Sequence, residues 1–376
     1  MYQVNFDIAD FLTNYWQKKP VVIKQAFKDF HDPISAEELA GLACEEEVAS
    51  RVILTEQNQW QIIPGPIEDY SAYGEQDWQL LVQAVNHWFP DSIALVEAFR
   101  FIPDWRFDDL MVSFATPGGG VGPHIDNYDV FLLQGSGSRR WKVGDIGHYR
   151  PRNGDTHTAL IDDFDPMLEV TLEKGDMLYI PPGFPHCAKT LSTALSYSIG
   201  FRAPSQQELF SSLADQLIDQ NTGLKRFTSN GEPTSPSCVS TAQQQGLQAM
   251  LAELIANETT MQPILGQLLS QNRFELDLCP ADEPYTSEML IEDIGHGAQL
   301  CRVGGLKIIQ LEADPLNRLF IDGQSHTLPA HLQPLATLLS DNIHLSQAQT
   351  STLLAEPEFV TLIVELINSG HMYLAE

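Results

Sequence analysis

The spacing of hydrophobic and polar positions changes three times along the 376-residue chain. In the first hundred residues, short predicted strands and helices alternate. PVVIKQAF (residues 20–27) is typical of a strand, and Ser35 opens a helix because Glu38, three positions later, completes a capping box. In WQLLVQAVNHW (residues 78–88), apolar side chains recur at helical spacing, which predicts a second helix there.

Short strands separated by glycine and proline dominate residues 109–204. LMVSFATPGGGVGPH predicts a strand that runs into a glycine loop, and DVFLLQGSGSRRWKVG predicts two strands joined by a Gly-Ser turn. GDMLYIPPGFPHCA and ALSYSIGFRA predict two further strands. Many short strands with this punctuation are typical of a sandwich or jelly roll rather than a parallel sheet.

Amphipathic helices follow the last of these strands. Ser205 and Glu208 form a second capping box, and further amphipathic stretches lie near residues 247–255 and 264–269. Four apolar side chains share one face of the first helix: Phe210, Leu213, Leu217 and Ile218. Because such helices cannot bury these faces alone, we expect them to pack on the strand domain or on a second copy of the chain. Residues 205–275 are therefore the predicted dimerisation segment.

The last hundred residues have a separate α/β pattern. AQLCRVGGLKIIQLE and NRLFIDGQSHTL are typical of strands, and PEFVTLIVELINSG predicts a helix that ends before Gly370. The chain is thus predicted to have three parts, which are residues 1–204, 205–275 and 276–376.

Composition narrows the class of protein. The chain has 43% hydrophobic residues, as globular proteins do, and no apolar run of about 18 residues that would predict a membrane span. The N-terminus lacks the basic region of a signal peptide. The five cysteines are scattered and never form a C-x-x-C pair, which argues against a disulfide framework or zinc-thiolate site and predicts a cytoplasmic location.

The net charge is −29, from 50 acidic and 21 basic residues. A field of this sign disfavours nucleic acid as a partner and favours a basic protein or peptide. An acidic surface that serves solubility alone explains the charge equally well, so the charge only supports conclusions reached from other residues.

The strongest chemical signal is a set of three potential metal ligands. His124 and Asp126 are two positions apart in a predicted strand, so their side chains share a face. His186, in IPPGFPHCA, follows another strand within a proline-rich frame. Two histidines and one carboxylate leave three octahedral positions open, as in the facial triad of non-haem Fe(II) oxygenases. Other histidines lack such a frame and are interpreted as surface or core residues: His87, His148, His157 and His371.

An iron centre with three open positions needs a cosubstrate. 2-Oxoglutarate can fill two positions and leave one for O₂, but its far carboxylate then needs a buried cation, for which the planar guanidinium of arginine is suited. Arg139 and Arg140 follow the strand that carries the first two ligands. Neighbours in a strand alternate, so only one of the pair is expected to face inward, and the spacing does not say which.

Three motifs together resemble JmjC-type 2-oxoglutarate oxygenases: PGGGVGPHIDNYDVFLLQGSGSRRW, GDMLYIPPGFPH and YSIGFRAP. The chain most closely resembles the bacterial ribosomal oxygenases, which hydroxylate an arginine of large-subunit ribosomal protein L sixteen. DFLTNYWQKKPVVIK, WQLLVQAVNHW and PDWRFDDLMVSF extend the match toward the N-terminus. The resemblance implies an α+β fold, with a double-stranded β-helix (a cupin or JmjC jelly roll), a helical dimerisation segment and a winged-helix-like C-terminal domain.

By position, the resemblance implies that His124, Asp126 and His186 ligate Fe(II) and that Arg139 binds 2-oxoglutarate. Ser113 matches a position close to the cosubstrate, although a strand serine bonded to backbone fits the sequence equally well. The implied reaction consumes O₂ and 2-oxoglutarate, forms succinate and CO₂, and hydroxylates a side chain of a basic ribosomal protein. We expect a homodimer without membrane or nucleic-acid partners.

An arginine substrate requires acids near the cavity to bind its guanidinium. Asp108, Asp109 and Asp129 are near in sequence, although each is also typical of a solvated acid. The ligands alone do not decide the substrate, so a histidine hydroxylase or lysine demethylase of the same class stays an alternative.

Two other classes compete with this interpretation. Cupin isomerases and dioxygenases that use no 2-oxoglutarate usually have more metal histidines and no paired arginine. A nucleic-acid-binding winged helix is the other class. Residues 275–376, however, hold 15 Asp or Glu against three Arg or Lys, a composition poor for phosphate contact.

Overall fold

The computed structural model describes residues 2–56, 59–152, 159–229, 235–281 and 283–375. The chain divides into two compact units. The first joins Met1–Ala203 to two later segments, Asn272–Cys279 and Val303–Gly305. The second joins Pro204–Gln271, Pro280–Arg302 and Leu306–Glu376. The three-part division predicted at residues 204 and 275 stays a prediction.

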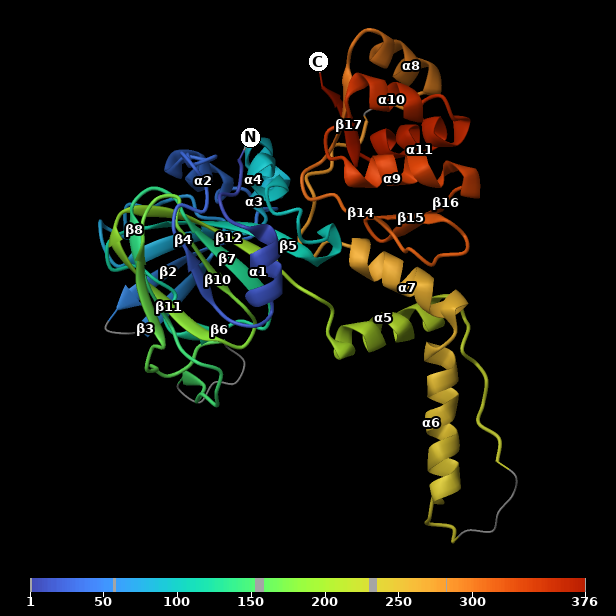
Figure 1. The fold of residues 1–376 in the computed structure, drawn as a ribbon, viewed down its shortest axis with the longest axis horizontal. Coiled ribbons are helices and arrows are strands. Elements are labelled where there is room, and N and C mark those ends of the chain that lie inside the picture. The colour runs from blue at the N-terminus through green and yellow to red at the C-terminus, as the bar shows by residue number, and fades with distance from the viewer. Residues whose placement is uncertain (1, 57–58, 153–158, 230–234, 282, 376) are drawn as a thin grey trace. The chain divides into compact units, whose positions relative to one another are not determined.

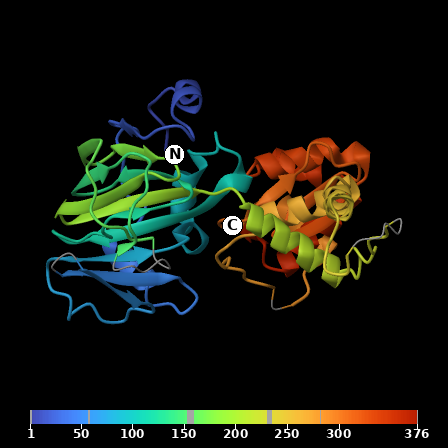
Figure 2. The same cartoon turned by 90° about the horizontal axis from the view of Figure 1, so that it is seen from below.

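Two antiparallel sheets form the first unit (Figures 1 and 2). The larger has the strand order β1-β10-β7-β12-β5-β4-β2-β3, and the smaller has the order β6-β11-β8-β9. The strands of the larger sheet are, in that order, Val21–Ile23, Met177–Ile180, Asp129–Gln134, Ala194–Phe201, Phe107–Ala115, Trp78–Val82, Ser50–Glu56 and Gln59–Pro64. Those of the smaller are His124–Ile125, Pro185–Ser192, Ser138–Val143 and Leu168–Leu172. The predicted jelly-roll architecture is confirmed.

The Gly-Ser turn between β7 and β8 connects the two sheets, because β7 belongs to the larger sheet and β8 to the smaller one. Gly137 in this turn has a φ of +77°, and a Cβ there would lie 2.1 Å from the carbonyl oxygen of Thr193. Only glycine fits this backbone and this close approach. The turn thereby carries the chain from one wall of the jelly roll to the other.

Strand β7 shows how the sheet separates two cores. Phe131 and Leu133 pack in the core beneath the N-terminal helices, whereas Val130 and Leu132 pack in the core between the sheets. The ring of Phe11, from α1, lies 5.3 Å from that of Phe131 between centroids. The helices of this unit are α1 Ile8–Asn14, α2 Ala36–Leu42, α3 Val85–Trp88 and α4 Ile93–Glu97, with short 3₁₀ turns at Pro90–Ser92 and Asp104–Arg106.

The helix predicted for residues 78–88 is wrong over its first half. Residues Trp78–Val82 form β4, and only Val85–Trp88 are helical. Strand β4 lies between β2 and β5, and every residue in it is buried. A strand that is covered on both faces has a continuous apolar run, in which helical spacing arises by coincidence.

The second unit holds the remaining helices and two small sheets, β13-β17 and β14-β15-β16. Its helices are α5 Gln206–Asp219, α6 Thr241–Ile255, α7 Glu258–Ser270, α8 Ser287–Gly295, α9 Gln333–Asp341, α10 Gln347–Leu353 and α11 Pro357–Asn368, with a 3₁₀ turn at Ala330–Leu332. Its strands are β13 Gln299–Arg302, β14 Ile308–Gln310, β15 Arg318–Ile321, β16 Gln324–Thr327 and β17 Met372–Ala375.

Local signals set the helix ends as predicted. Both capping boxes, Ser35 with Glu38 and Ser205 with Glu208, are present. Gly370 follows α11 with a φ of +79°. Across the described residues, none of the helices has the length and apolarity to cross a membrane.

Candidate metal and cosubstrate site

A cavity of about 590 Å³ opens between the two sheets of the first unit. Ser113 and Leu132 from the larger sheet line it, and so do Arg139 and Trp141 from the smaller one. The side chains that line it on each strand are separated by two positions, as the alternation of a strand requires. The cavity is therefore built into the jelly roll.

The three predicted metal ligands meet at this cavity. His124 lies on β6 opposite His186 on β11, and Asp126 follows β6 directly. Their ligand atoms all lie within 4.8 Å of one another, and no other His, Cys, Asp or Glu side chains of the described residues form such a group. The Asp126 Oδ2 atom lies 3.9 Å from Nε2 of His124 and 3.6 Å from Nε2 of His186, too far for hydrogen bonds.

Backbone carbonyls orient both imidazole rings. Nδ1 of His124 lies 2.9 Å from the carbonyl oxygen of Gly122, and Nδ1 of His186 lies 3.0 Å from that of Phe184. A carbonyl only accepts, so each Nδ1 carries the proton and each Nε2 keeps its lone pair for a metal. Burial, with His124 beside it, lowers the pKa of His186 to about 4, which keeps this ring neutral at pH 7. Two imidazoles and a carboxylate fit an octahedral Fe(II) ion.

Arg139 is a buried cation without a counter-charge in its hydrogen bonds. Its side chain donates from Nη1 to the Ser196 hydroxyl at 2.7 Å, and that hydroxyl lies 2.9 Å from the hydroxyl of Ser113. Within the described structure, its Nε and Nη2 have no hydrogen-bond partner. Burial lowers the pKa of Arg139 to about 10, so the group stays charged at pH 7. Arg140 points outward and is half exposed, so one arginine of the pair faces inward, as alternation requires.

Comparison with known proteins decides the family. Residues 94–209 match the model of the JmjC domain, and residues 253–373 match that of the ROXA-like winged helix. The chain is 40% identical over 374 residues to the ribosomal protein uL16 3-hydroxylase of Escherichia coli, covering 99% of each chain. This chain belongs to the JmjC-type ribosomal oxygenases. The predicted family, enzyme class and winged-helix-like end are thereby confirmed.

Other similar proteins agree. A probable ribosomal oxygenase of Haemophilus influenzae is 32% identical to this ribosomal oxygenase over 343 residues, covering 84% of this chain and 80% of the relative. The X-ray structure of E. coli YcfD superposes with a TM-score of 0.93 at 40% identity, covering 100% of both chains. A YcfD structure in complex with cobalt and 2-oxoglutarate gives a TM-score of 0.91 at the same identity and coverage.

The sequence did not predict two residues at or beside the cavity of the oxygenase. Ser196 pairs with Ser113 across β12 and β5 and accepts the hydrogen bond from Arg139. Gln79 lines the cavity from β4, is 1% exposed, and has no hydrogen-bond partner for its Oε1 in the described structure. An amide inside the apolar run WQLLV was the available signal for Gln79, whereas Ser196 is recognisable only from the strand register.

The three candidate acids lie in different places. Asp109 lines the cavity, and burial, together with the neighbouring charge of Asp108, raises its pKa to about 7. Asp108 accepts hydrogen bonds from Arg273, a residue that also lines the cavity. Asp129 accepts a 2.5 Å hydrogen bond from the hydroxyl of Tyr179 and does not line the cavity. One of the three acids thus faces the site.

Of the four histidines interpreted as surface or core residues, the structure describes three. His87 is buried with its Nδ1 2.8 Å from the carbonyl oxygen of Glu275, His148 is exposed, and His371 lies 3.3 Å from Asp322. His157 lies outside the described residues.

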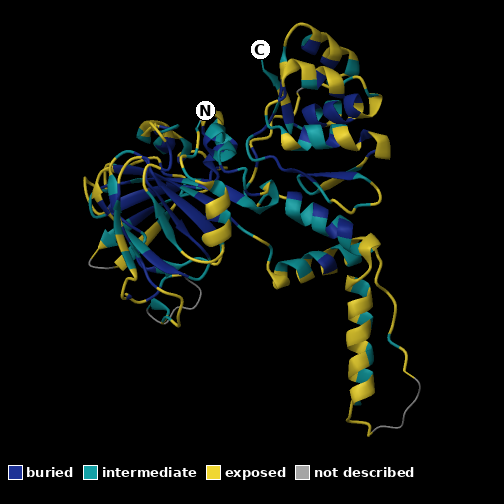
Figure 3. Cartoon of the chain, in the orientation of Figure 1, coloured by how far each residue is buried: buried dark blue, intermediate teal, exposed yellow. Residues whose placement is uncertain are grey.

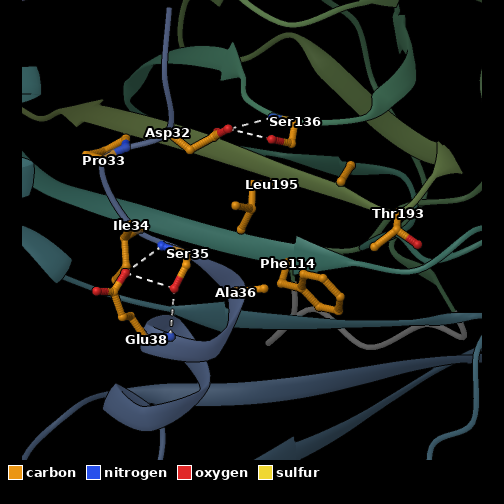
Figure 4. A pocket seen from close by; sticks show the side chains of 11 residues that line it. Asp32, Pro33, Ile34, Ser35, Ala36, Glu38, Phe114, Ser136, Thr193 and Leu195 are labelled. Atoms are coloured by element: carbon orange, nitrogen blue, oxygen red, sulfur yellow. Dashed lines mark hydrogen bonds between the residues drawn. The ribbon is translucent and has the colours of Figure 1, made fainter.

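The opposite face of the larger sheet has a second pocket, of about 540 Å³ (Figure 4). Phe114 and Leu195 line it; Phe114 adjoins Ser113 in sequence, and Leu195 adjoins Ser196, the strand partner of Ser113. Asp32 in this pocket accepts hydrogen bonds from the backbone nitrogen and the hydroxyl of Ser136. Ser35 and Glu38 also line this pocket, and they hydrogen-bond to each other in the capping box.

Proposed function

We propose that this ribosomal oxygenase hydroxylates an arginine of the ribosomal protein uL16, with Fe(II) as metal and 2-oxoglutarate and O₂ as cosubstrates. The observation that carries the proposal is the position of Arg139: a buried guanidinium with two unpartnered nitrogens lines the same cavity as the three ligand side chains. The named activity of the E. coli relative, and the 2-oxoglutarate bound in a YcfD structure, support it.

In this proposal, His124, Asp126 and His186 hold the Fe(II) ion. The ion, when bound, supplies the chemistry that couples decarboxylation of 2-oxoglutarate to hydroxylation of a carbon. The protein fixes the ring orientations through the carbonyls of Gly122 and Phe184. These contacts leave both Nε2 atoms directed at the space beside Asp126.

Arg139 and Ser113 bind 2-oxoglutarate in this proposal. The guanidinium has Nε and Nη2 free to pair with the far carboxylate, in a setting where water does not compete. The Ser196 hydroxyl accepts from Arg139, and in this proposal it donates its one proton to Ser113. The hydroxyl proton of Ser113 is then left to donate to an oxygen of the cosubstrate.

Asp109 gives the cavity an acid that a cationic substrate can contact. Arg139 lies on the small sheet, and Asp109 lines the cavity from β5. An anionic cosubstrate and a guanidinium are thus attracted to different groups of one cavity. A basic ribosomal protein also suits a chain of net charge −29.

The decisive experiment is mass spectrometry of uL16 after incubation with the enzyme, Fe(II), 2-oxoglutarate and O₂, with His124→Ala as the control. A gain of one oxygen on an arginine, absent with the control, supports the proposal. Oxygen on a histidine, or demethylation of a lysine, redirects it to the alternative substrates. Turnover of 2-oxoglutarate without any modified residue rejects the ribosomal substrate and keeps the oxygenase chemistry.

We further propose that the enzyme is a cytoplasmic homodimer that pairs through the helical segment 205–275. Leu247, Leu251 and Ile255 recur every fourth position along α6 and are 40%, 53% and 42% exposed. None of the residues of α6 is buried, and Figure 3 shows the helix exposed along its length. An apolar stripe of this kind is stabilised by a second copy. Leu251→Glu is expected to give a folded monomer by light scattering; an unchanged mass rejects this interface.

We propose neither nucleic acid nor membrane as a partner. We expect no mobility shift of ribosomal RNA in the presence of the protein, even at low salt, where electrostatic binding of nucleic acid is strongest.

A further inference from the structure

The segment Asn272–Cys279 belongs to the first unit, although the helical segment precedes it in the chain. Two of its residues, Arg273 and Phe274, line the cavity. Arg273 donates from Nε to Oδ1 of Asp108 at 3.2 Å and from Nη2 to Oδ2 at 2.6 Å. Its Nη2 also lies 4.0 Å from Oδ1 of Asp109. One guanidinium therefore contacts both members of an acid pair.

Asp109 is surrounded by few other groups that can set its charge. The backbone nitrogen of Ala84 donates to it at 3.1 Å. With its amide nitrogen turned to Asp109, Gln83 donates at 2.5 Å and accepts from Arg51 at 3.3 Å. The charged and titratable groups that act on Asp109 are Asp108, Arg273 and Arg51, and the phenol of Tyr128 also lies close enough to interact with it.

Two buried carboxylates side by side repel each other, and each loses the solvation of water. Both effects favour a protonated acid. The side chains of Asp108 and Asp109 are 9% and 8% exposed, so water does little to separate their charges. Arg273 and Arg51 oppose this by stabilising the ionised form of Asp109. An ionised carboxylate, unlike a protonated acid, offers a substrate guanidinium an opposite charge and two acceptor oxygens for a bidentate pair.

We infer that Arg273 is a positioning residue that favours the ionised form of Asp109, so that Asp109 binds the cationic side chain of the substrate. This inference rests on the proposed function, because it assigns a role within the same site. Arg273 acts through Asp109 and does not contact the reacting atoms. Since its side chain is 47% exposed, it neutralises the pair from the outer side of the cavity.

The test compares Arg273→Gln with wild type and with Arg140→Gln, which removes the same charge from a half-exposed position outside the cavity. Initial rates of uL16 hydroxylation are measured from pH 6 to pH 9. For Arg273→Gln, we expect the KM for uL16 at pH 7 to rise about tenfold with less than about a twofold change in kcat and in the KM for 2-oxoglutarate. The rise is expected to shrink toward pH 9, where Asp109 ionises without help.

Arg273→Lys supplies a second variant, because it restores the charge without the planar fork. We expect it to recover most of the KM at pH 7. An Arg273→Gln enzyme with an unchanged KM at every pH overturns the inference, and a lowered KM overturns it by showing that Arg273 competes with the substrate. If the wild type itself leaves uL16 unmodified, the proposed function has failed instead.

Discussion

The cavity and the second pocket lie on opposite faces of the larger sheet, and comparing them indicates which face carries the function. They have similar volumes, about 590 and 540 Å³, and β5 and β12 form a wall of both. The first contains Arg139 and Gln79, which keep polar atoms without partners in the described structure. In the second, Asp32 accepts four hydrogen bonds. The two cavities therefore differ little in volume. They differ in whether the buried polar atoms in them have hydrogen-bond partners.

The physical reason is the free energy of burying a polar group. A buried polar atom without a hydrogen bond destabilises the fold by about 1–3 kcal/mol, and a charged one by more. Such groups are rare in folded proteins, and a cavity that gathers them offers polar atoms for a ligand to satisfy. The first face of the sheet is thus built for binding and the second for stability. Substitutions on the two faces are expected to affect different quantities, which gives ways to test this comparison.

The largest effect is expected from removing a metal ligand on the first face. Asp126→Ala deletes the carboxylate that lies 3.6 Å from Nε2 of His186. We expect product formation to fall more than about 100-fold, since loss of even an outer partner of a ligand lowers metal affinity or activity 10–100-fold. Elemental analysis is expected to show metal lost from a protein with an unchanged circular dichroism spectrum. Full metal content with full activity would contradict the assignment.

Arg139→Met is expected to separate binding from stability. The KM for 2-oxoglutarate is expected to rise by about 30-fold or more, because a desolvated charge pair contributes at least about 2 kcal/mol. The Tm of the protein without cosubstrate is expected to stay equal or to rise, because the variant no longer buries an unpaired charge. Calorimetry and steady-state kinetics measure the two effects. A lowered Tm would show that Arg139 stabilises the empty fold.

On the second face, a substitution is expected to lower stability and leave cosubstrate binding unchanged. Asp32→Ala removes the acceptor for Ser136, Lys174 and Tyr197. We expect the free energy of unfolding to fall by about 2–4 kcal/mol, since buried donors lose their partner. Urea denaturation measures this loss. The KM for 2-oxoglutarate is expected to stay at the wild-type value, and a change in it would break the comparison.

The contribution of Asp32 to stability is also expected to depend on pH. Burial alone would raise the pKa of Asp32, but hydrogen bonds from Ser136 and Lys174 lower it overall. The folded pKa thus lies below the unfolded value of about 3.9. The stabilisation is present above that value and is lost as the pH falls through the folded pKa. The unfolding free energies of Asp32→Asn and wild type, from urea denaturation, are expected to differ at pH 7 and to converge only as the pH falls through the folded pKa of Asp32.

The smallest effect is expected from Gln79→Leu. Gln79 lies two residue pairs along the β4–β5 ladder from the pair that includes Ser113. Loss of one neutral hydrogen bond to the cosubstrate, worth about 1 kcal/mol, is expected to raise the KM for 2-oxoglutarate about fivefold without lowering the Tm. Gln79→Glu, which places a negative charge there, is expected to raise this KM further. Equal KM values in all three proteins would remove Gln79 from the site.

Local signals in the sequence predicted much of this molecule. Both capping boxes are present because capping depends on residues three positions apart. His124 and Asp126 are similarly close, and a proline frame marks His186, so the triad was recognisable before the fold was known. Alternation predicted that one arginine faces inward, but only the family resemblance pointed to Arg139.

Features that depend on long-range contacts escaped sequence analysis. Strand β4 was mistaken for helix because neighbours on both sides bury all of its residues. Ser196 joins the site through the β5–β12 register, over a separation of 83 residues from Ser113. Arg273 reaches Asp108 across 165 residues, a distance over which spacing carries no information.

The composition of the first unit also limits which piece of the gene can be transferred to another protein by recombination. Its later segments supply Arg273 to the cavity and place Gly304 against Asn86, where a Cβ would lie only 1.8 Å from the carbonyl oxygen. Asn86 in turn accepts from the backbone nitrogen of Leu110 on β5. A gene fragment that stops after residue 204 lacks these pieces. The oxygenase is therefore not a portable module, and recombination must carry the downstream sequence along with it.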